Sequence, residues 1–423
     1  MSQTFLVAIL GILFYLSSLL GGHAPNSDWN GTNPPDTTFT SIGYVKDSPA
    51  TLREGPGTDQ TRLSVLEPES SVEILDETNG WYQVRTESGD TGWVAGMLIQ
   101  SGAALKPGNY EVMGYYMGTS NNSSLQSLQR HHTQMTKVIP WAFSVTATGD
   151  VVNATPTNQL ADLLKMVGEN TELETLALIS NYDQKTHKFS PEIASSVLRN
   201  PRQRSRAIAN ITKTLENWGV SGVNIDFEHV PPRDRDYYTL FIKELSEQLR
   251  PKGLSVTVAI PAKTYDDPNS NWSGAFDYAQ IGRYADYVVL MAYDQHWTGG
   301  DPGPIASAQW VEQVVKYAVS QIPRQKVILG VPGYGYAWSG PGKGATVNYE
   351  SAVRIANTGS GVQWDEQSKT PYANAQGREI WFENAASLGH KLDIVTKYGV
   401  KGIALWRLGQ EDPNSWRIIS AKL

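Results

Sequence analysis

The stretch Ser221-Gly222-Val223-Asn224-Ile225-Asp226-Phe227-Glu228 is the most informative segment of the chain. Its apolar and polar residues alternate, which predicts a β-strand, because successive side chains of a strand point to opposite faces. Asn224, Asp226 and Glu228 then share one face. Two carboxylates on one strand face alter each other's proton affinity, which acid–base chemistry uses. The alternative is an edge strand with a polar outer face, but the flanking apolar residues favour burial, and buried carboxylates are rare without a function.

The composition restricts the class of protein. With 423 residues, 40% of them hydrophobic and 18% charged, the chain is globular and long enough for a large core plus an accessory module. The net charge of −7 and the lack of a basic block argue against nucleic acid as a partner. No cysteine is present, which excludes disulfides and thiolate metal sites. No other metal-ligand cluster is visible, and no metal or cofactor is predicted.

Residues 1–24 predict an export signal. The apolar run from Phe5 to Leu20 is short for a membrane span, and small residues allow cleavage after Ala24. The first basic residue is Lys46, so the usual basic start of a signal peptide is missing, and an uncleaved N-terminal anchor is the alternative. A secreted protein is expected, with membrane contact only through an uncleaved anchor. Residues 25–40 are polar, rich in turn formers, and predict a linker.

Residues 41–101 predict a compact β module. Short alternating segments at 50–53, 71–75, 81–85 and 92–94 are separated by Gly-Pro-Gly, Asn-Gly and Ser-Gly-Asp turns. The module resembles the bacterial SH3-like domain, and the matching residues are Leu52-Arg53-Glu54-Gly55-Pro56-Gly57, Asn79-Gly80-Trp81-Tyr82-Gln83-Val84-Arg85 and Thr91-Gly92-Trp93-Val94. The resemblance implies attachment to cell-wall peptidoglycan. The alternative is a spacer without a ligand, since a fold does not determine a function.

Residues 108–423 predict strands that alternate with helices. The strands are near-continuous apolar runs, as in a buried parallel sheet, at 110–116, 137–145, 175–180, 222–228, 255–261, 287–293, 326–332 and 402–406. Helical apolar faces occur at 207–215, ending at Gly219, and at 238–249, ending before Pro251 and Gly253. This order predicts an α/β fold, a (β/α)8 TIM barrel. A doubly wound open sheet is the alternative, but no Gly-rich nucleotide motif follows the first strand.

The active site of such a barrel lies where the strands end. Polar and aromatic residues collect at those ends: Asp226 and Glu228 on strand four, Met291, Tyr293 and Asp294 on strand six, Trp406 on strand eight, and Tyr115 and Phe143 on strands one and two. A single aromatic residue here is more often part of the core, but their convergence indicates a site. His229 and His296, also near the rim, are interpreted as ordinary loop residues.

Together these residues resemble glycoside hydrolase family 18. That family carries Asp-x-x-Asp-x-Asp-x-Glu on strand four, Met-x-Tyr-Asp on strand six and Trp on strand eight. The pattern covers residues 110–410, and Gly-Val-Asn-Ile-Asp-Phe-Glu with an SH3-like module is typical of the spore-cortex and cell-wall branch. The resemblance implies hydrolysis of N-acetylglucosamine-containing glycan, with peptidoglycan or spore cortex as the leading substrate. The alternatives are a chitinase on chitin-like chains, a chitinase-like lectin, against which Glu228 argues, and a structural coat protein.

The resemblance also implies a retaining mechanism without a protein nucleophile, in which the substrate's acetamide oxygen attacks the anomeric carbon. Glu228 would be the general acid and then the general base. Asp226 would hold the acetamide N–H, and Tyr293 would orient the acetamide carbonyl. Trp406 would lie beneath the sugar. The other residues that would bind the substrate are Asn224, Met291, Asp294, Tyr115 and Phe143. The mechanism needs no metal or cofactor, and a monomer is expected.

Two positions depart from the family signature. Ser221 replaces its first Asp, a change that the sequence does not explain, and Asn224 replaces the second. An amide cannot ionise, so the cluster loses one like charge. Asp226 should therefore ionise more readily here than it does in the chitinases.

Residues 340–377 form a long segment rich in Gly, Ser, Asn and Gln. Many chitinases insert an α+β domain at this place, and the segment is shorter than such a domain. A hairpin or an irregular flap is expected instead, together with a shallow, open groove that suits a peptide-substituted glycan.

Overall fold

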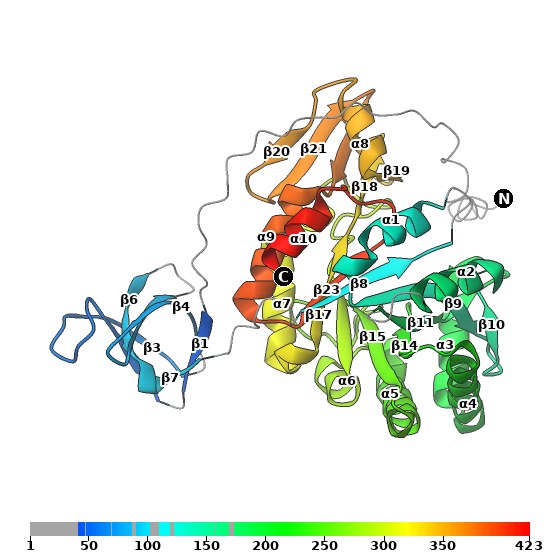
Figure 1. Cartoon of the computed structure of the whole chain (residues 1–423), viewed down its shortest axis with the longest axis horizontal. Helices are drawn as coiled ribbons and strands as arrows, with labels where there is room; N and C mark the ends of the chain where they lie inside the picture. Colours follow the sequence, from blue (N-terminus) through cyan, green and yellow to red (C-terminus); the bar gives the residue numbers. More distant parts are fainter. Residues whose placement is uncertain are drawn as a thin grey trace, which may run out of the picture. The chain divides into compact units, whose positions relative to one another are not determined.

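The computed structural model describes residues 41–46, 48–68, 70–86, 90–101, 110–118, 122–155, 157–168 and 173–423. The predicted signal or anchor (1–24) and the linker (25–40) lie outside these residues. The chain forms two compact units, which are described one after the other (Figure 1). No helix in the described ranges is both long and apolar enough to cross a membrane.

The first unit is a small all-β barrel-like module. Its strands are β1 (Ser41–Val45), β2 (Ala50–Arg53), β3 (Arg62–Leu66), β4 (Ser71–Thr78), β5 (Trp81–Thr86), β6 (Thr91–Ala95) and β7 (Ile99–Ser101). They pair in the order β3-β2-β6-β5-β4-β1-β7 around a core that includes Leu52, Val84 and Val94. Asn79 and Gly80 both adopt positive φ between β4 and β5, as the Asn-Gly signal predicts for a tight hairpin. The predicted β module is confirmed.

The second unit contains a closed barrel of parallel strands. In the described residues these are β8 (Glu111–Tyr116), β9 (Lys137–Val145), β11 (Glu174–Ser180), β14 (Gly222–Asp226), β15 (Ser255–Pro261), β16 (Tyr287–Met291), β17 (Val327–Pro332) and β23 (Gly402–Trp406). They pair in this order, and pairing of β23 with β8 and of β8 with β9 closes the ring. The short β10 (Val151–Asn153) adds to β9 in antiparallel orientation. The predicted TIM barrel is confirmed.

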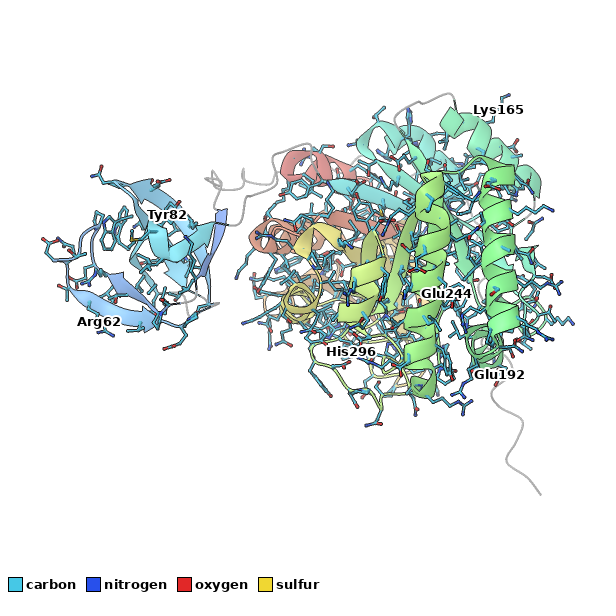
Figure 2. The ribbon with its side chains drawn as sticks, turned by 90° about the horizontal axis from the view of Figure 1, so that it is seen from below. Arg62, Tyr82, Lys165, Glu192, Glu244 and His296 are labelled. Carbon is cyan, nitrogen blue, oxygen red and sulfur yellow. The ribbon has the colours of Figure 1, made fainter. Side chains whose placement is uncertain are left out.

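Helices surround this barrel (Figure 1). They are α1 (Ser123–His131), α2 (Thr157–Gly168), α3 (Pro191–Arg199), α4 (Pro201–Trp218), α5 (Arg235–Leu249), α6 (Tyr278–Tyr284), α7 (Ala308–Gln321), α9 (Ala385–Tyr398) and α10 (Ser415–Lys422). The two apolar faces predicted from the sequence belong to α4 and α5, and α4 ends at Gly219, whose φ of 61° few other residues tolerate. Arg204 of α4, which is almost fully buried, pairs with Glu244 of α5 at 2.8 Å, so an ion pair joins the two helices (Glu244 is labelled in Figure 2).

The segment between β17 and α9 corrects a prediction. Instead of a hairpin or irregular flap it forms a small α+β insertion with β18 (Tyr334–Trp338), β19 (Gly344–Asn348), α8 (Tyr349–Ala356), β20 (Gln363–Asp365), β21 (Thr370–Ala375) and β22 (Arg378–Phe382). The strands pair antiparallel in the order β19-β18-β22-β21-β20, and α8 lies against the sheet (Figure 1).

The insertion is larger than residues 340–377 because β18 starts before Gly340 and β22 ends after Gly377. Its core is made mostly of alanines packed with Ile380 and Phe382, so sheet and helix approach closely and little chain is needed. The expectation of a shallow, open groove depended on a short flap and loses that support.

The base of the barrel holds an ionic cluster at the amino ends of the strands, in which Lys137 is buried, Glu111 is mostly buried and Glu174 is half-exposed. Lys137 lies 3.0 Å from Glu111 and 3.2 Å from Glu174. Glu111 also accepts hydrogen bonds from the hydroxyls of Thr136, at 2.6 Å, and Tyr287, at 3.0 Å. Burial by itself would raise the pKa of Glu111, but these donors and the Lys137 charge outweigh it and lower that pKa. The barrel therefore begins with a compensated buried charge.

Candidate active site

Strand β14 alternates as the sequence predicts. Asn224 and Asp226 are buried in the barrel strand, and Phe227 on the other face stacks on Phe241 of α5 with ring centroids 5.5 Å apart. Ser221 lies just before the strand, where its backbone bonds to Thr175 and Ser255 of the neighbouring strands. Ser221 is at the opposite end of β14 from Glu228, so it is not one of the rim residues.

Glu228 follows β14 and is held by a residue that the sequence analysis missed. The backbone N–H of Glu228 donates to Asn181 Oδ1 at 2.9 Å, and Asn181 Nδ2 donates back to the Glu228 carbonyl at 2.8 Å. The same amide also donates to the Ser190 carbonyl at 3.0 Å. Asn181 is fully buried and follows β11 directly. A polar residue at a strand end was the signal that could have indicated this clamp.

Asp226 and Glu228 share a buried environment in which no cation of the described residues compensates them. Burial raises the pKa of Asp226. Burial raises the pKa of Glu228 well above its usual value, and the charges of Asp226 and then Asp294 raise it further. Two such groups cannot both be ionised at low cost, so the pair holds one proton in common. Glu228 is shifted by two carboxylates in addition to burial, so of the two groups it is the one that its surroundings push more strongly towards the protonated form.

Tyr293 and Asp294 follow β16 at the same rim. Burial raises the pKa of the Tyr293 hydroxyl, and so do Tyr115, Asp226, Asp294 and Glu228, which places Tyr293 among the carboxylates in its neutral, donating form.

Asp294 adopts a positive φ of 58° and, although the residue is exposed, its carboxylate accepts hydrogen bonds from the hydroxyls of Tyr334 and Tyr336. Desolvation of the carboxylate by the surrounding protein raises the pKa of Asp294, while the hydrogen bonds from the two tyrosine hydroxyls oppose that shift. Both tyrosines belong to β18, so the α+β insertion contributes to the site. The alternation Tyr334-Gly335-Tyr336-Ala337-Trp338 was a strand signal in the sequence.

An aromatic wall stands across the barrel from these groups. The Trp406 ring lies 5.2 Å from Tyr115 and 5.7 Å from Trp141, and Met291 packs against the same interior cluster. Trp141 in turn contacts Tyr182 and Phe189, in the short pair of β12 (Tyr182–Asp183) and β13 (Lys188–Phe189).

Phe143 does not join this wall. The register of β9 against β11 shifts so that Leu178 pairs with Trp141 and the next residue, Ile179, pairs with Phe143. The extra residue turns Phe143 away from the barrel interior. Its ring packs instead against Trp218 of α4, with the ring centroids 6.1 Å apart. The structure therefore puts Trp141, not the predicted Phe143, with the other predicted site residues.

Asn224 lies beneath the carboxylates. It accepts a hydrogen bond from the Tyr115 hydroxyl at 3.3 Å, while its own Nδ2 is buried without a hydrogen-bond partner in the described residues. That Asp226 ionises more readily here than beside a second Asp stays a prediction, because it compares two different side chains. In the present structure burial still raises the pKa of Asp226.

The rim thus combines an acid whose pKa is raised, a neighbouring carboxylate, a tyrosine with a raised pKa and an aromatic wall. Acid–base groups aimed at a site with flat apolar walls are suited to cleaving the bond between sugar units, whose ring faces stack on aromatic side chains. Within the described residues no group of three or more His, Asp or Glu side chains could hold a metal ion. Fold and site define a barrel glycosidase.

Comparison with known proteins gives the family. Residues 111–411 match the model of Glycosyl hydrolases family 18, and residues 48–100 match the Bacterial SH3 domain. The chain belongs to glycosyl hydrolase family 18. It is 31% identical to an uncharacterized glycosylase, YvbX, of Bacillus subtilis over 314 residues, which cover 71% of this chain and 88% of that protein.

Two solved structures are also similar. The chitinase of Chromobacterium violaceum has a TM-score of 0.69 and 30% identity, over 73% of this chain and 98% of that one. The spore cortex-lytic enzyme SleL of Bacillus cereus has a TM-score of 0.69 and 26% identity, over 79% of this chain and 77% of that one. The chain is therefore a glycosidase related both to chitinases and to spore cortex-lytic enzymes.

Proposed function

We propose that this glycosidase hydrolyses β-linked N-acetylglucosamine glycan with retention of configuration, by a mechanism in which the substrate's own acetamide is the nucleophile. The observation that carries the proposal is the buried Asp226–Glu228 pair, in which no cation of the described residues compensates either charge. A protonated Glu228 would donate its proton to the glycosidic oxygen as the bond breaks. The same carboxylate would then accept a proton from the attacking water.

The acetamide would be held by the two groups next to this acid. An ionised Asp226 would accept the acetamide N–H, which makes the carbonyl oxygen a better nucleophile and stabilises the positive charge of the cyclic intermediate. The Tyr293 hydroxyl, kept neutral by its surroundings, would donate to that oxygen and orient it towards the anomeric carbon. Trp406 would support the sugar ring, with Met291, Asp294, Tyr115 and Asn224 around it.

Peptidoglycan, in cell wall or spore cortex, is the leading substrate in this proposal. Support comes from the similarity to SleL and from the SH3 domain, which would attach the chain to the wall. Export through residues 1–24 belongs to the same proposal. Chitin-like chains are the second candidate, since the similarity to a chitinase is equally strong by TM-score. A product analysis also separates these substrates from a lectin or coat role, in which glycan would be bound without being cleaved.

Product analysis tests the proposal. The protein is incubated with peptidoglycan fragments and, separately, with chitooligosaccharides, beside the Glu228→Gln variant, and products are measured by mass spectrometry and by NMR of the new anomeric centre. We expect cleavage by the wild-type chain alone, with the β-anomer formed first. Replacing the N-acetyl group by N-trifluoroacetyl should slow cleavage strongly, because the carbonyl oxygen becomes a poorer nucleophile. Equal rates for the two acyl groups would contradict the assisted mechanism, and no cleavage of either glycan would contradict the enzyme proposal.

A further inference from the structure

The loop between β15 and α6 carries two large aromatic side chains that the catalytic proposal does not use. Trp272 is 46% exposed and Tyr265 is 70% exposed. The loop follows the carboxyl end of β15, next to β14 in the ring. An exposed indole on the catalytic face of a barrel offers a flat apolar surface on which a sugar ring can stack. The indole of Trp272 is therefore a candidate contact for a ligand on this face.

Trp272 is in direct contact with the residue that follows the catalytic acid. Its ring lies 5.2 Å from the His229 imidazole in an edge-to-face arrangement. His229 adopts a positive φ of 54°, a left-handed conformation that histidine, asparagine and aspartate adopt more readily than other non-glycine residues, so the backbone changes direction immediately after Glu228. Burial lowers the pKa of His229, so the ring is neutral at pH 7. A neutral imidazole beside an exposed indole is suited to an uncharged sugar.

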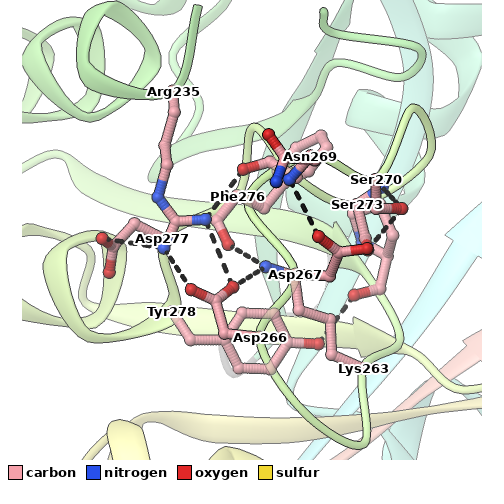
Figure 3. Close-up of polar contacts among 12 residues, drawn as sticks. Arg235, Lys263, Asp266, Asp267, Asn269, Ser270, Ser273, Phe276, Asp277 and Tyr278 are labelled. Atoms are coloured by element: carbon pink, nitrogen blue, oxygen red, sulfur yellow. Dashed lines mark hydrogen bonds and ion pairs between the residues drawn. The ribbon is translucent and has the colours of Figure 1, made fainter. Parts of the chain in front are cut away.

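The loop that presents Trp272 is firmly braced. Arg235, the first residue of α5, binds both oxygens of Asp266 at 3.2 and 2.8 Å, the Gly274 carbonyl at 2.8 Å and Asp277 at 3.0 Å (Figure 3). The almost fully buried Lys263 donates to Asp266 at 2.7 Å and to the Phe276 carbonyl at 2.6 Å.

The tip of the loop is closed by its own backbone. Gly274 N donates to the Ser270 carbonyl at 2.9 Å, and a Cβ at position 274 would come within 2.6 Å of two carbonyl oxygens. A loop held in this way does not need to be ordered by its ligand, which lowers the entropic cost of binding. The brace therefore makes Trp272 a fixed platform.

We propose that Trp272, together with His229, forms a binding subsite for a sugar on the leaving-group side of the scissile bond. The inference depends on the proposed function. A general acid protonates the oxygen of the departing sugar, so that sugar and those attached to it lie beyond the Glu228 carboxyl, on the side away from Trp406 and Trp141. His229 follows Glu228 in the chain, and its ring contacts Trp272, so the two side chains lie next to the catalytic acid. Stacking of a sugar ring on the indole would hold the departing chain in line.

Binding to a catalytically silent chain tests the subsite. The full chain with Glu228→Gln is titrated calorimetrically with the β-linked hexamer of N-acetylglucosamine. Adding Trp272→Ala should weaken hexamer binding about tenfold, and Trp272→Phe should restore part of it, since a smaller ring keeps some stacking area. The matched control is Tyr237→Ala, which removes a 39% exposed aromatic ring that packs on Arg199 on the outer side of α5. Unchanged hexamer affinity in Trp272→Ala would overturn the subsite.

The side of the scissile bond is tested by the cleavage pattern. The hexamer, labelled with ¹⁸O at its reducing end, is digested by chains that carry the intact Glu228. Trp272→Ala should shift cleavage towards bonds that release short leaving groups, because long ones lose their platform. A shift in the other direction would overturn the leaving-group assignment. If the Glu228→Gln chain binds no hexamer and the wild-type chain cleaves neither glycan, the proposed function fails together with the subsite. If cleavage and binding are normal and neither changes in Trp272→Ala, the subsite alone is overturned.

Discussion

The two ends of the barrel interior both hold buried carboxylates, and they treat them in opposite ways. At the base, Glu111 is surrounded by Lys137 and two hydroxyl donors, and its pKa is lowered. At the rim, Asp226 and Glu228 lie close to each other and near Asp294, no cation of the described residues compensates the pair, and their pKa values are raised. The two ends belong to one barrel and differ in the side chains around each carboxylate and in how deeply it is buried.

The comparison separates structural from chemical charge. A compensated carboxylate stays ionised, costs the fold much less than an unpaired buried charge, and has no proton to exchange near neutral pH. An uncompensated pair costs stability but keeps a proton available for transfer, which is what general acid catalysis needs. The uncompensated carboxylates at the rim thus lower the stability of the fold and, for the same reason, are suited to the proposed activity. Measurements on substituted chains test whether the two ends differ in this way.

The largest effect is expected for Glu228→Gln. The amide keeps the shape of the side chain but cannot donate a proton to the leaving oxygen, so kcat should fall by about 10³-fold or more. The measurement is the initial rate on chitooligosaccharide or peptidoglycan fragments, with circular dichroism to verify folding. A rate within tenfold of wild type would mean that the acid lies elsewhere.

Asp226→Asn should follow, with a loss of kcat of about 10²-fold. The neutral amide still fits beside the acetamide but no longer stabilises positive charge in the intermediate. Substrate affinity, measured by calorimetry in the Glu228→Gln background, should therefore change little. Undiminished turnover would remove the role of Asp226 as the acetamide clamp, and a large loss of affinity would assign it to ground-state binding instead.

Lys137→Met removes the cation that compensates Glu111 at the base of the barrel. Glu111 then remains buried without its cation, which should cost about 3 kcal/mol of unfolding free energy. Chemical denaturation followed by circular dichroism measures the loss, and turnover per folded molecule should be kept because the base is at the far end of the strands from Glu228. The control is Lys252→Met, whose exposed partner Glu216 lies 2.8 Å away and whose loss should cost less than about 0.5 kcal/mol. Equal costs for the two variants would contradict the comparison.

The sequence was sufficient to predict those helices and strands in which apolar residues recur with a regular spacing. Strand β14 and the faces of α4 and α5 are regular, so alternation and helical spacing predicted them. The rim residues Asp226, Glu228, Tyr293 and Trp406 were predictable because a barrel brings all strand ends to one face.

The parts that failed depend on contacts between distant segments. Asn181 stands at a strand end, which marks it as a candidate, but its partner is the backbone of Glu228, 47 positions along the chain, and its own position does not indicate that partner. Phe143 was assigned by counting along β9, and a single register shift gave its place to Trp141. The α+β insertion was underestimated because its alanine core needs few residues, and its tyrosines reach Asp294 from a strand that composition alone did not delimit.

A smaller effect is expected on stability in Glu228→Gln. A carboxyl whose pKa is raised in the folded state costs no stability where it is protonated in both states, but it imposes a growing penalty on folding as the pH rises above the unfolded pKa of about 4.3. The amide removes that penalty. Thermal unfolding at pH 5 and pH 8 should show a gain that grows with pH to roughly 1 kcal/mol, or roughly 2–4 °C. Glu247→Gln, at a 64% exposed side chain, is the control and should show no such growth.

The smallest effect is expected for Asp294→Asn, which should change only the pH dependence of kcat/KM. The Asp294 charge contributes to the raised pKa of Glu228 after burial and Asp226, so its removal lowers that pKa. Glu228 then loses its proton at lower pH, and the alkaline limb of kcat/KM should move to lower pH. The shift should be smaller than that of the same limb in Asp226→Asn, because Asp226 is the greater of the two charge effects. The amide oxygen introduced by the substitution can still accept hydrogen bonds from Tyr334 and Tyr336, so their contact with residue 294 is kept. An alkaline limb that does not move would mean that Asp294 acts by position and not by charge, and the rim would then hold two coupled carboxylates, not three.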